Sequence, residues 1–228
     1  MRRMYPARAI LATLLVTAGA AAQEPISFPT QDGGLVHADL YGKGDRAVVL
    51  AHGARFNKES WRKQAEALEQ AGFRVLAINF RGYGESRGPG QAAPLSAPLH
   101  LDVLAAVRYL RGAGAKTVSV VGGSMGGDAA GDASIEAEPG EIDRLVFLGS
   151  GGSDRPEKMK GRKLFIIARD DLGSGDIPRL PKVREHYEKT PGPKALIILD
   201  GSAHAQFLFA TDQAERVLRE IVRFLSEE

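Results

Sequence analysis

Short and nearly unbroken apolar runs alternate with helical stretches along most of this chain. Runs such as Ala47–Ala51 and Lys163–Ala168 are almost wholly apolar. A strand of this kind is buried on both faces, which is typical of parallel sheets whose crossover connections are helices. The alternation therefore predicts one α/β domain of three layers, with a mostly parallel central sheet between two layers of helices.

The predicted elements follow one another without a linker long enough to separate a second domain. The predicted strands are Val36–Tyr41, Ala47–Ala51, Arg74–Asn79, Thr117–Val121, Leu145–Leu148, Lys163–Ala168 and Ala195–Leu199. The predicted helices are Ser60–Ala71, Leu99–Arg111, Met125–Ala137, Arg179–Lys189 and Thr211–Leu225. Two stretches rich in residues that break regular structure, 82–98 and 170–181, are expected to be loops.

The first 22 residues have a different character from the rest of the chain. Three arginines precede an apolar run near residues 9–18, and Ala20-Ala21-Ala22 then meets Gln23. This order is typical of a secretory signal peptide with an A-x-A cleavage site. An apolar run of about 10 residues is too short to cross a bilayer, which needs about 20. We therefore predict a signal peptide over 1–22, a mature domain over 23–228 without stable membrane insertion, and export to the periplasm or beyond.

Charge and cysteine content exclude several classes of protein. The chain carries a net charge of +2, and its first 22 residues hold three arginines and no acid, so residues 23–228 carry −1. That balance argues against nucleic-acid binding. The chain has no cysteine, which excludes a thiol nucleophile and a thiolate metal site. We expect no metal and no cofactor, and no particular oligomeric state is predicted.

A glycine-serine motif lies where the predicted strand Thr117–Val121 meets the predicted helix Met125–Ala137. The residues Gly122-Gly123-Ser124-Met125-Gly126 fit the pattern G-x-S-x-G. In this strand-to-helix context the pattern forms a tight turn that presents a serine hydroxyl above the sheet. The helix places the positive end of its dipole beside that hydroxyl. Ser124 is therefore the candidate nucleophile, although glycine-rich turns of this kind also bind phosphate.

A serine nucleophile requires a general base, which is almost always histidine. His204 follows the last predicted strand, at the same edge of the sheet as Ser124. The acid that orients the base is expected between the two in chain order. Asp170 and Asp171 both follow the strand Lys163–Ala168 and point in different directions, so only one can contact His204. We favour Asp171, with Asp170 as the alternative acid.

A second loop, His52-Gly53-Ala54, follows the strand Ala47–Ala51. Loops at this position supply a backbone N–H to an oxyanion, beside the N–H of the residue after the nucleophile. We expect Ala54 and Met125 to be these two donors and His52 to have a structural role. Three residues that follow are candidates for the wall of a substrate cleft or for packing: Arg55, Phe56 and Trp61. The remaining histidines are expected to be exposed to solvent: His37, His100 and His186.

The order of these signals resembles the α/β-hydrolase superfamily, in its dienelactone-hydrolase-like and esterase-like branch. The oxyanion loop comes first, followed by Arg81-Gly82-Tyr83-Gly84-Glu85-Ser86, the Ser124 motif, the two aspartates and His204. The resemblance covers about residues 26 to 226 and implies the α/β-hydrolase fold. Dienelactone hydrolases use cysteine where this chain has Ser124. Too few residues separate 149 from 163 for the cap domain that related proteins insert there, so we expect no cap and an open site.

The resemblance implies a serine hydrolase that cleaves carboxylic esters through a Ser-His-Asp triad and an acyl-enzyme. Its partner would be a small-molecule acyl substrate. A peptidase, a thioesterase or an acyltransferase would use the same groups, because specificity depends on the pocket. A non-catalytic binding or assembly protein on the same fold is the alternative from a different class.

Overall fold

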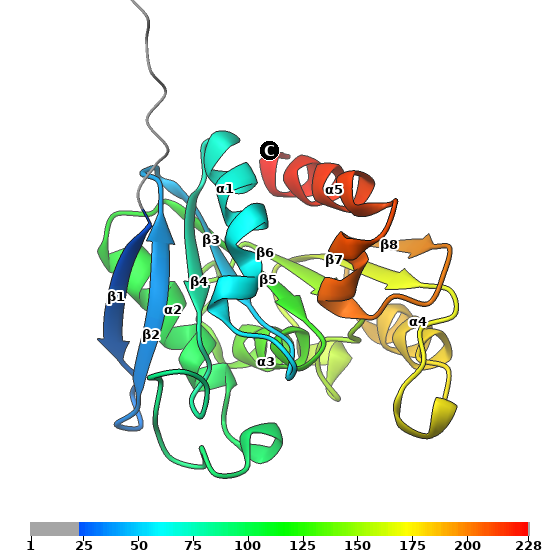
Figure 1. Ribbon diagram of the computed structural model, residues 1–228, viewed down its shortest axis with the longest axis horizontal. Coiled ribbons are helices and arrows are strands. Elements are labelled where there is room, and N and C mark those ends of the chain that lie inside the picture. The colour runs from blue at the N-terminus through cyan, green and yellow to red at the C-terminus, as the bar shows by residue number, and fades with distance from the viewer. Residues whose placement is uncertain (1–22, 228) are drawn as a thin grey trace, which may run out of the picture.

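An eight-stranded sheet forms the centre of the protein in the computed structural model, which describes residues 23–227 (Figure 1). The strands are β1 Glu24–Pro29, β2 Leu35–Tyr41, β3 Arg46–Ala51, β4 Arg74–Ile78, β5 Thr117–Gly123, β6 Arg144–Leu148, β7 Arg162–Ala168 and β8 Lys194–Leu199. Their order in the sheet is β1-β2-β4-β3-β5-β6-β7-β8. The pairs β1–β2 and β2–β4 are antiparallel and all other pairs are parallel, so the sheet is mostly parallel as predicted.

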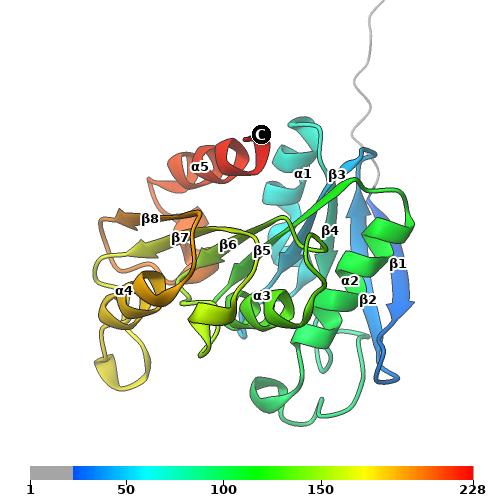
Figure 2. The same cartoon turned by 180° about the vertical axis from the view of Figure 1, so that it is seen from behind.

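Helices cover both faces of this sheet and complete the three layers. The helices are α1 Arg62–Gln70, α2 His100–Gly112, α3 Met125–Glu136, α4 Leu180–Lys189 and α5 Ala214–Ser226. Helices α1 and α5 lie on one face, and α2, α3 and α4 lie on the other, which faces the viewer in Figure 2. The buried apolar residues accordingly form two clusters, one on each side of the sheet. No helix within residues 23–227 is long and apolar enough to span a bilayer.

Every predicted strand and helix is present, with bounds that differ by a few residues. The structure adds β1, which pairs with β2 at the edge of the sheet. Its sequence contains Pro25 and Pro29, and proline is a poor signal for a strand because it cannot donate to a sheet ladder. An edge position tolerates it, since one side of the strand has no partner. The predicted signal peptide lies outside the described residues.

Parallel strands bring the loops that follow them to a single edge of the sheet. The loops after β3, β5, β7 and β8 hold His52, Ser124, Asp171 and His204 respectively. Between β6 and β7 the described chain contains only the short 3-10 helix η3 Pro156–Lys158 and no inserted cap domain. The carboxyl edge of the sheet is therefore bordered by the loops and short 3-10 helices that follow the strands.

Candidate active site

Ser124 occupies a strained turn between β5 and α3. Its backbone angles are φ 49° and ψ −117°, in a region that residues with a side chain rarely adopt. Such a conformation costs on the order of 1–3 kcal/mol and persists where the surroundings hold it. The Ser124 N–H donates to the Leu148 carbonyl at 2.9 Å, which fixes the turn to β6. The serine thereby becomes the N-terminal cap residue of α3, with its hydroxyl beside the first turn of that helix.

The glycines two residues on either side of Ser124 are required by close backbone contacts. A Cβ at Gly122 would overlap the carbonyl of Gly126, and a Cβ at Gly126 would overlap the carbonyl of Ala51. The G-x-S-x-G spacing is therefore a steric requirement, because helix α3 leaves the turn directly against β3 and β5.

Three side chains form a continuous chain of hydrogen bonds at this edge. His204 Nε2 lies 2.8 Å from Ser124 Oγ, and His204 Nδ1 lies 2.8 Å from Asp171 Oδ2. Asp171 is fully buried, and its second oxygen, Oδ1, lies 3.6 Å from Arg179 Nε. Asp170 is exposed, and its backbone N–H donates to the Gly201 carbonyl. The structure thus brings Asp171 to the histidine and leaves Asp170 on the surface.

The loop after β3 is held by a neutral histidine. The Phe80 N–H donates to His52 Nε2 at 3.2 Å, so the proton of the ring is on Nδ1, which lies 2.9 Å from the Gly53 carbonyl. Burial lowers the pKa of His52 to about 4, so the ring is uncharged at neutral pH. His52 therefore joins the loops after β3 and β4, the structural role that we predicted for it.

The two predicted oxyanion donors lie beside the nucleophile. Ala54, Met125, Ser124 and His204 all line one cavity of about 670 Å³. Met125 is the first residue of α3, so its N–H has no carbonyl partner within the helix. The peptide that carries the Ala54 N–H is held through its Gly53 carbonyl by His52 Nδ1 at 2.9 Å, and the following peptide is held through the Ala54 carbonyl, which accepts from the Tyr83 hydroxyl at 3.0 Å.

Gln206 links the histidine loop to the oxyanion loop. The Gly53 N–H donates to Gln206 Oε1 at 2.7 Å, and Gln206 Nε2 donates to Ser60 Oγ at 2.7 Å. Ala205, between His204 and Gln206, has a positive φ of 50°. The sequence gives no role to Gln206, whose only signal is its position two residues after His204. Tyr83 lies in the segment 81–86 that carries part of the family resemblance, but no role for its hydroxyl follows from that segment.

A second cavity, of about 700 Å³, lies beside the first and shares Ser124 with it. Arg55 and Phe56 line the first cavity, as one of the two alternatives predicted. Trp61 lines neither cavity; it is fully buried and packs edge-to-face on Phe209 with 5.9 Å between ring centroids, the second alternative predicted for it. Within the described part of the chain, no three carboxylate or imidazole groups are arranged to hold a metal ion.

Of the three histidines predicted to be exposed to solvent, His37 and His100 are half-buried and His186 is buried. His186, expected to be exposed, is 8% exposed and lies on the inner side of α4. Its Nδ1 is 3.3 Å from the Gly151 carbonyl, and it lines the second cavity. The helix α4 is mostly polar, so sequence periodicity gave no clear inner face, and the few contacts that it makes with β7 determine which side is buried.

Comparison with known proteins agrees with this arrangement. The family model described as alpha/beta hydrolase fold matches residues 46–173, more than half of the chain. The chain belongs to the α/β-hydrolase family. An esterase of Pyrococcus furiosus superposes with a TM-score of 0.75 at 20% identity, covering 97% of this chain and 98% of that one. A dienelactone hydrolase of Anabaena variabilis gives a TM-score of 0.71 at 21% identity, covering 90% and 96%.

Curated relatives match shorter segments of this α/β hydrolase. Bifunctional epoxide hydrolase 2 of Sus scrofa is 42% identical over 83 residues, which are 36% of this chain and 14% of that protein. A 2-hydroxy-6-oxononadienedioate/2-hydroxy-6-oxononatrienedioate hydrolase of Burkholderia vietnamiensis is 32% identical over 130 residues, 54% and 42% of the two chains. The chain therefore spans less than half the length of either relative. Both relatives are named as hydrolases, and each match covers only a segment of the two chains.

Proposed function

We propose that this protein is a serine hydrolase that cleaves carboxylic esters through an acyl-enzyme intermediate. The observation that carries the proposal is the unbroken contact from Ser124 Oγ to His204 Nε2 and from His204 Nδ1 to Asp171 Oδ2, at 2.8 Å each. These are the contacts by which a nucleophile is activated by a base and the base is held by an acid.

The reaction follows from these positions. Ser124 Oγ attacks the ester carbonyl carbon, and its proton passes to His204 Nε2. The N–H groups of Ala54 and Met125 stabilise the oxyanion that forms. When the carbon–oxygen bond to the alcohol breaks, His204 returns the proton to the leaving oxygen. A water molecule then attacks the acyl carbon and gives a proton to His204. His204 passes this proton to Ser124 Oγ as the bond between Oγ and the acyl carbon breaks, which releases the acid and restores the free serine. Asp171 stabilises the positive imidazole ring in both halves.

Apolar side chains around the nucleophile favour esters with an apolar acyl part. Among the described residues, four large hydrophobic side chains are exposed: Leu95, Leu172, Ile177 and Phe207. Each lines one of the two cavities that also contain Ser124. Phe56 adds a further ring, with its centroid 4.9 Å from that of Phe207. Exposed apolar surface gathered in this way is typical of a ligand site.

Labelling with a fluorophosphonate probe tests the proposal. We expect the folded protein to be labelled at Ser124 and the Ser124→Ala variant to remain unlabelled. Absence of labelling on folded wild-type protein would instead support a binding or assembly protein. A substrate panel then separates the related activities. Hydrolysis of p-nitrophenyl esters indicates an esterase, hydrolysis of thioesters a thioesterase and hydrolysis of anilides a peptidase. Transfer of the acyl group to an added alcohol indicates an acyltransferase.

We also propose that residues 1–22 are a signal peptide and that the protein is exported. This proposal is supported by the order of the sequence, in which arginines are followed by an apolar run and then by Ala20-Ala21-Ala22 before Gln23. Expression of the full chain in a bacterial host, followed by fractionation and N-terminal sequencing, should give an exported protein that begins at Gln23. An intact N-terminus in the cytoplasmic fraction would contradict this.

A further inference from the structure

The acid of the proposed triad is buried, and one of its two oxygens makes no hydrogen bond. Asp171 is fully buried, and its Oδ2 lies 2.8 Å from His204 Nδ1. Its second oxygen, Oδ1, is also buried and has no hydrogen-bond partner among residues 23–227. Burial favours the protonated form of a carboxyl group, unless hydrogen bonds or a positive charge stabilise the ionised form. An ionised Asp171 therefore depends on a positive charge near Oδ1.

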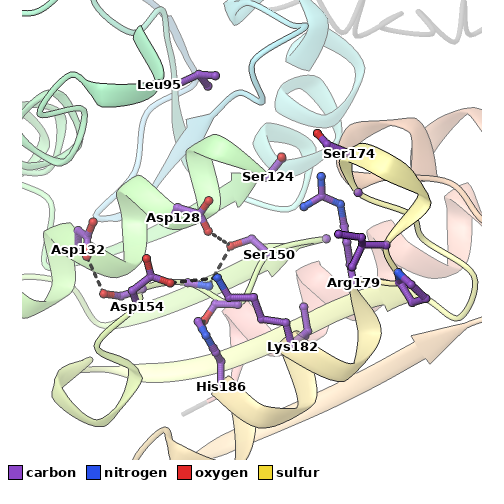
Figure 3. A pocket seen from close by; sticks show the side chains of 18 of the residues that line it. Leu95, Ser124, Asp128, Asp132, Ser150, Asp154, Ser174, Arg179, Lys182 and His186 are labelled. Atoms are coloured by element: carbon purple, nitrogen blue, oxygen red, sulfur yellow. Dashed lines mark hydrogen bonds and ion pairs between the residues drawn. The ribbon is translucent and has the colours of Figure 1, made fainter. Parts of the chain in front are cut away.

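Arg179 places a positive charge beside this oxygen. Its Nε lies 3.6 Å from Asp171 Oδ1, and the Arg179 side chain is 38% exposed whereas that of Asp171 is fully buried. This separation is too long for a hydrogen bond, so the contact acts through charge. Arg179 also lines both cavities, and Figure 3 shows its guanidinium extending from the start of α4 towards the end of the cavity that holds Ser124.

The chain between Asp171 and Arg179 is closed into a small loop that holds the two residues together. The Arg179 N–H donates to the Asp171 carbonyl at 2.9 Å, and Leu172 and Pro178 form an antiparallel bridge within the loop. The Arg179 Nε–H also donates to the Leu172 carbonyl at 3.3 Å. Backbone and side-chain contacts therefore keep the guanidinium close to the oxygen that has no hydrogen bond.

Other charged groups around the site do not share this contact. In the described chain, the ion pairs of Asp171 are those with Arg179 and His204. The loop after β6 packs against Asp171 and His204 with Gly149, which has no side chain. Asp170, beside Asp171 in the chain, is exposed. Within residues 23–227, the other titratable or charged residues of the two cavities form neither an ion pair nor a hydrogen bond with Asp171 or His204: Arg55, His100, Asp128, Asp132, Asp154, Arg155 and Lys182.

We propose, on the basis of the serine hydrolase proposed above, that Arg179 extends the activity to lower pH by acting through the triad. Its charge stabilises the ionised Asp171 and opposes protonation of the His204 ring, because a positive charge favours a nearby anion and disfavours a second cation. Both effects preserve a neutral base beside Ser124 as the pH falls. Arg179 is thus a positioning residue, since it lies beside the acid and does not contact the reacting atoms.

The pH dependence of Ser124 labelling tests this role without knowledge of the natural ester. When an uncharged fluorophosphonate reacts, Ser124 Oγ attacks phosphorus, its proton passes to His204 Nε2, and fluoride leaves. The second-order rate of labelling therefore falls at low pH, where His204 can no longer accept a proton. The variant Arg179→Gln removes the charge and leaves the backbone contact with Asp171 in place.

We expect the acid limb of this pH profile to move to higher pH by about half a unit to one unit in Arg179→Gln. A shift of this size is smaller than that of a fully buried charge pair, because solvent and salt screen the half-exposed arginine. The rate on the plateau at higher pH should change less than about threefold, because the triad itself is unaltered.

Three further variants separate the charge from the shape of the side chain. Arg179→Lys keeps the charge and should keep the wild-type limb, whereas Arg179→Met keeps the apolar stem alone and should show the same shift as Arg179→Gln. Arg184→Gln removes an exposed arginine of α4 that lines neither cavity, so it is the control for net charge and should leave the limb in place. Circular dichroism establishes that each variant is folded.

The outcomes separate this inference from the proposed function. An acid limb that moves in both neutral variants of Arg179, but not in Arg179→Lys or Arg184→Gln, supports the role of Arg179. An unchanged limb in both neutral variants, or an equal shift in Arg184→Gln, would refute that role and leave the serine hydrolase intact. Wild-type protein that is folded and is not labelled at Ser124 would overturn both proposals together.

Discussion

Replacing Asp171 by asparagine tests the proposed mechanism most directly, because the geometry allows no harmless orientation of the new amide. If the asparagine oxygen faces His204 Nδ1, its NH₂ group faces Arg179 Nε, which lies 3.6 Å from the present Oδ1. The neutral NH₂ group then replaces a carboxylate oxygen beside the positive Arg179 side chain, whose Nε–H is donated to the Leu172 carbonyl at 3.3 Å. If the amide is reversed, NH₂ faces Nδ1 and forces the ring proton onto Nε2. The histidine can then no longer accept a proton from Ser124.

The size of the effect follows from the lost charge. During the reaction the imidazole ring becomes positive, and the Asp171 carboxylate lies with its oxygen 2.8 Å from Nδ1. Charges centred about 4 Å apart interact by about 4 kcal/mol at an effective dielectric constant of about 20. That energy corresponds to a decrease in kcat of about 10³-fold. KM should change little, since the carboxylate does not touch the substrate.

Steady-state hydrolysis of p-nitrophenyl butyrate measures this effect, with Asp170→Asn as the matched control. Asp170 is the exposed neighbour of Asp171 in the same loop, so its replacement should change kcat less than about twofold. Circular dichroism and thermal unfolding establish that both variants are folded. The assignment of the acid fails if Asp170→Asn is the more damaging change, or if Asp171→Asn retains wild-type turnover.

Three further predictions follow from single contacts. Asp128→Asn should stabilise the protein by about 1 kcal/mol at pH 7, after allowance for solvent screening. The reason is that burial raises the pKa of Asp128 to about 6, so the folded state is destabilised when this carboxyl is ionised. The gain in Tm should disappear as the pH falls from 6 towards 4, because the carboxyl of the folded protein then becomes protonated. Gly126→Ala should abolish folding or lower Tm by many degrees, since its Cβ would overlap the Ala51 carbonyl. Gln206→Ala should lower kcat about tenfold by freeing the buried Gly53 N–H, and Gln206→Glu, which keeps an acceptor, should restore most of the activity.

The arrangement of strands could be predicted because it rests on local patterns. Buried strands such as β5 and β7 are continuous apolar runs, and the helices between them have glycine or loop residues at their ends. Chain order then assigns Ser124, Asp171 and His204 to the same edge, since parallel strands end together. Edge strand β1 lacked such a pattern, because prolines and exposed residues dominate its sequence.

The remaining parts of the site depend on contacts between distant segments, which no local pattern reports. The choice of Asp171 over Asp170 depends on the turn in which the Asp171 N–H bonds to the Ala168 carbonyl. Gln206 reaches Gly53 across 153 positions of sequence. Helical spacing of four from Ser124 was readable for Asp128, but only the structure shows that this face of α3 lines a cavity. Contacts of this kind are determined by packing and not by sequence periodicity.

Strained backbone conformations lie at the same edge of the sheet as the proposed triad, and their position there supports a functional role for this edge. In the described chain, three non-glycine residues have a positive φ; one is Ser124, the proposed nucleophile, and another is Ala205, which directly follows the proposed base His204. Each of these backbone conformations destabilises the folded state locally. A sequence that otherwise suits its fold retains such strained conformations where binding or a reaction depends on them. The strained serine and the strained histidine loop therefore belong to one site and should be tested as one.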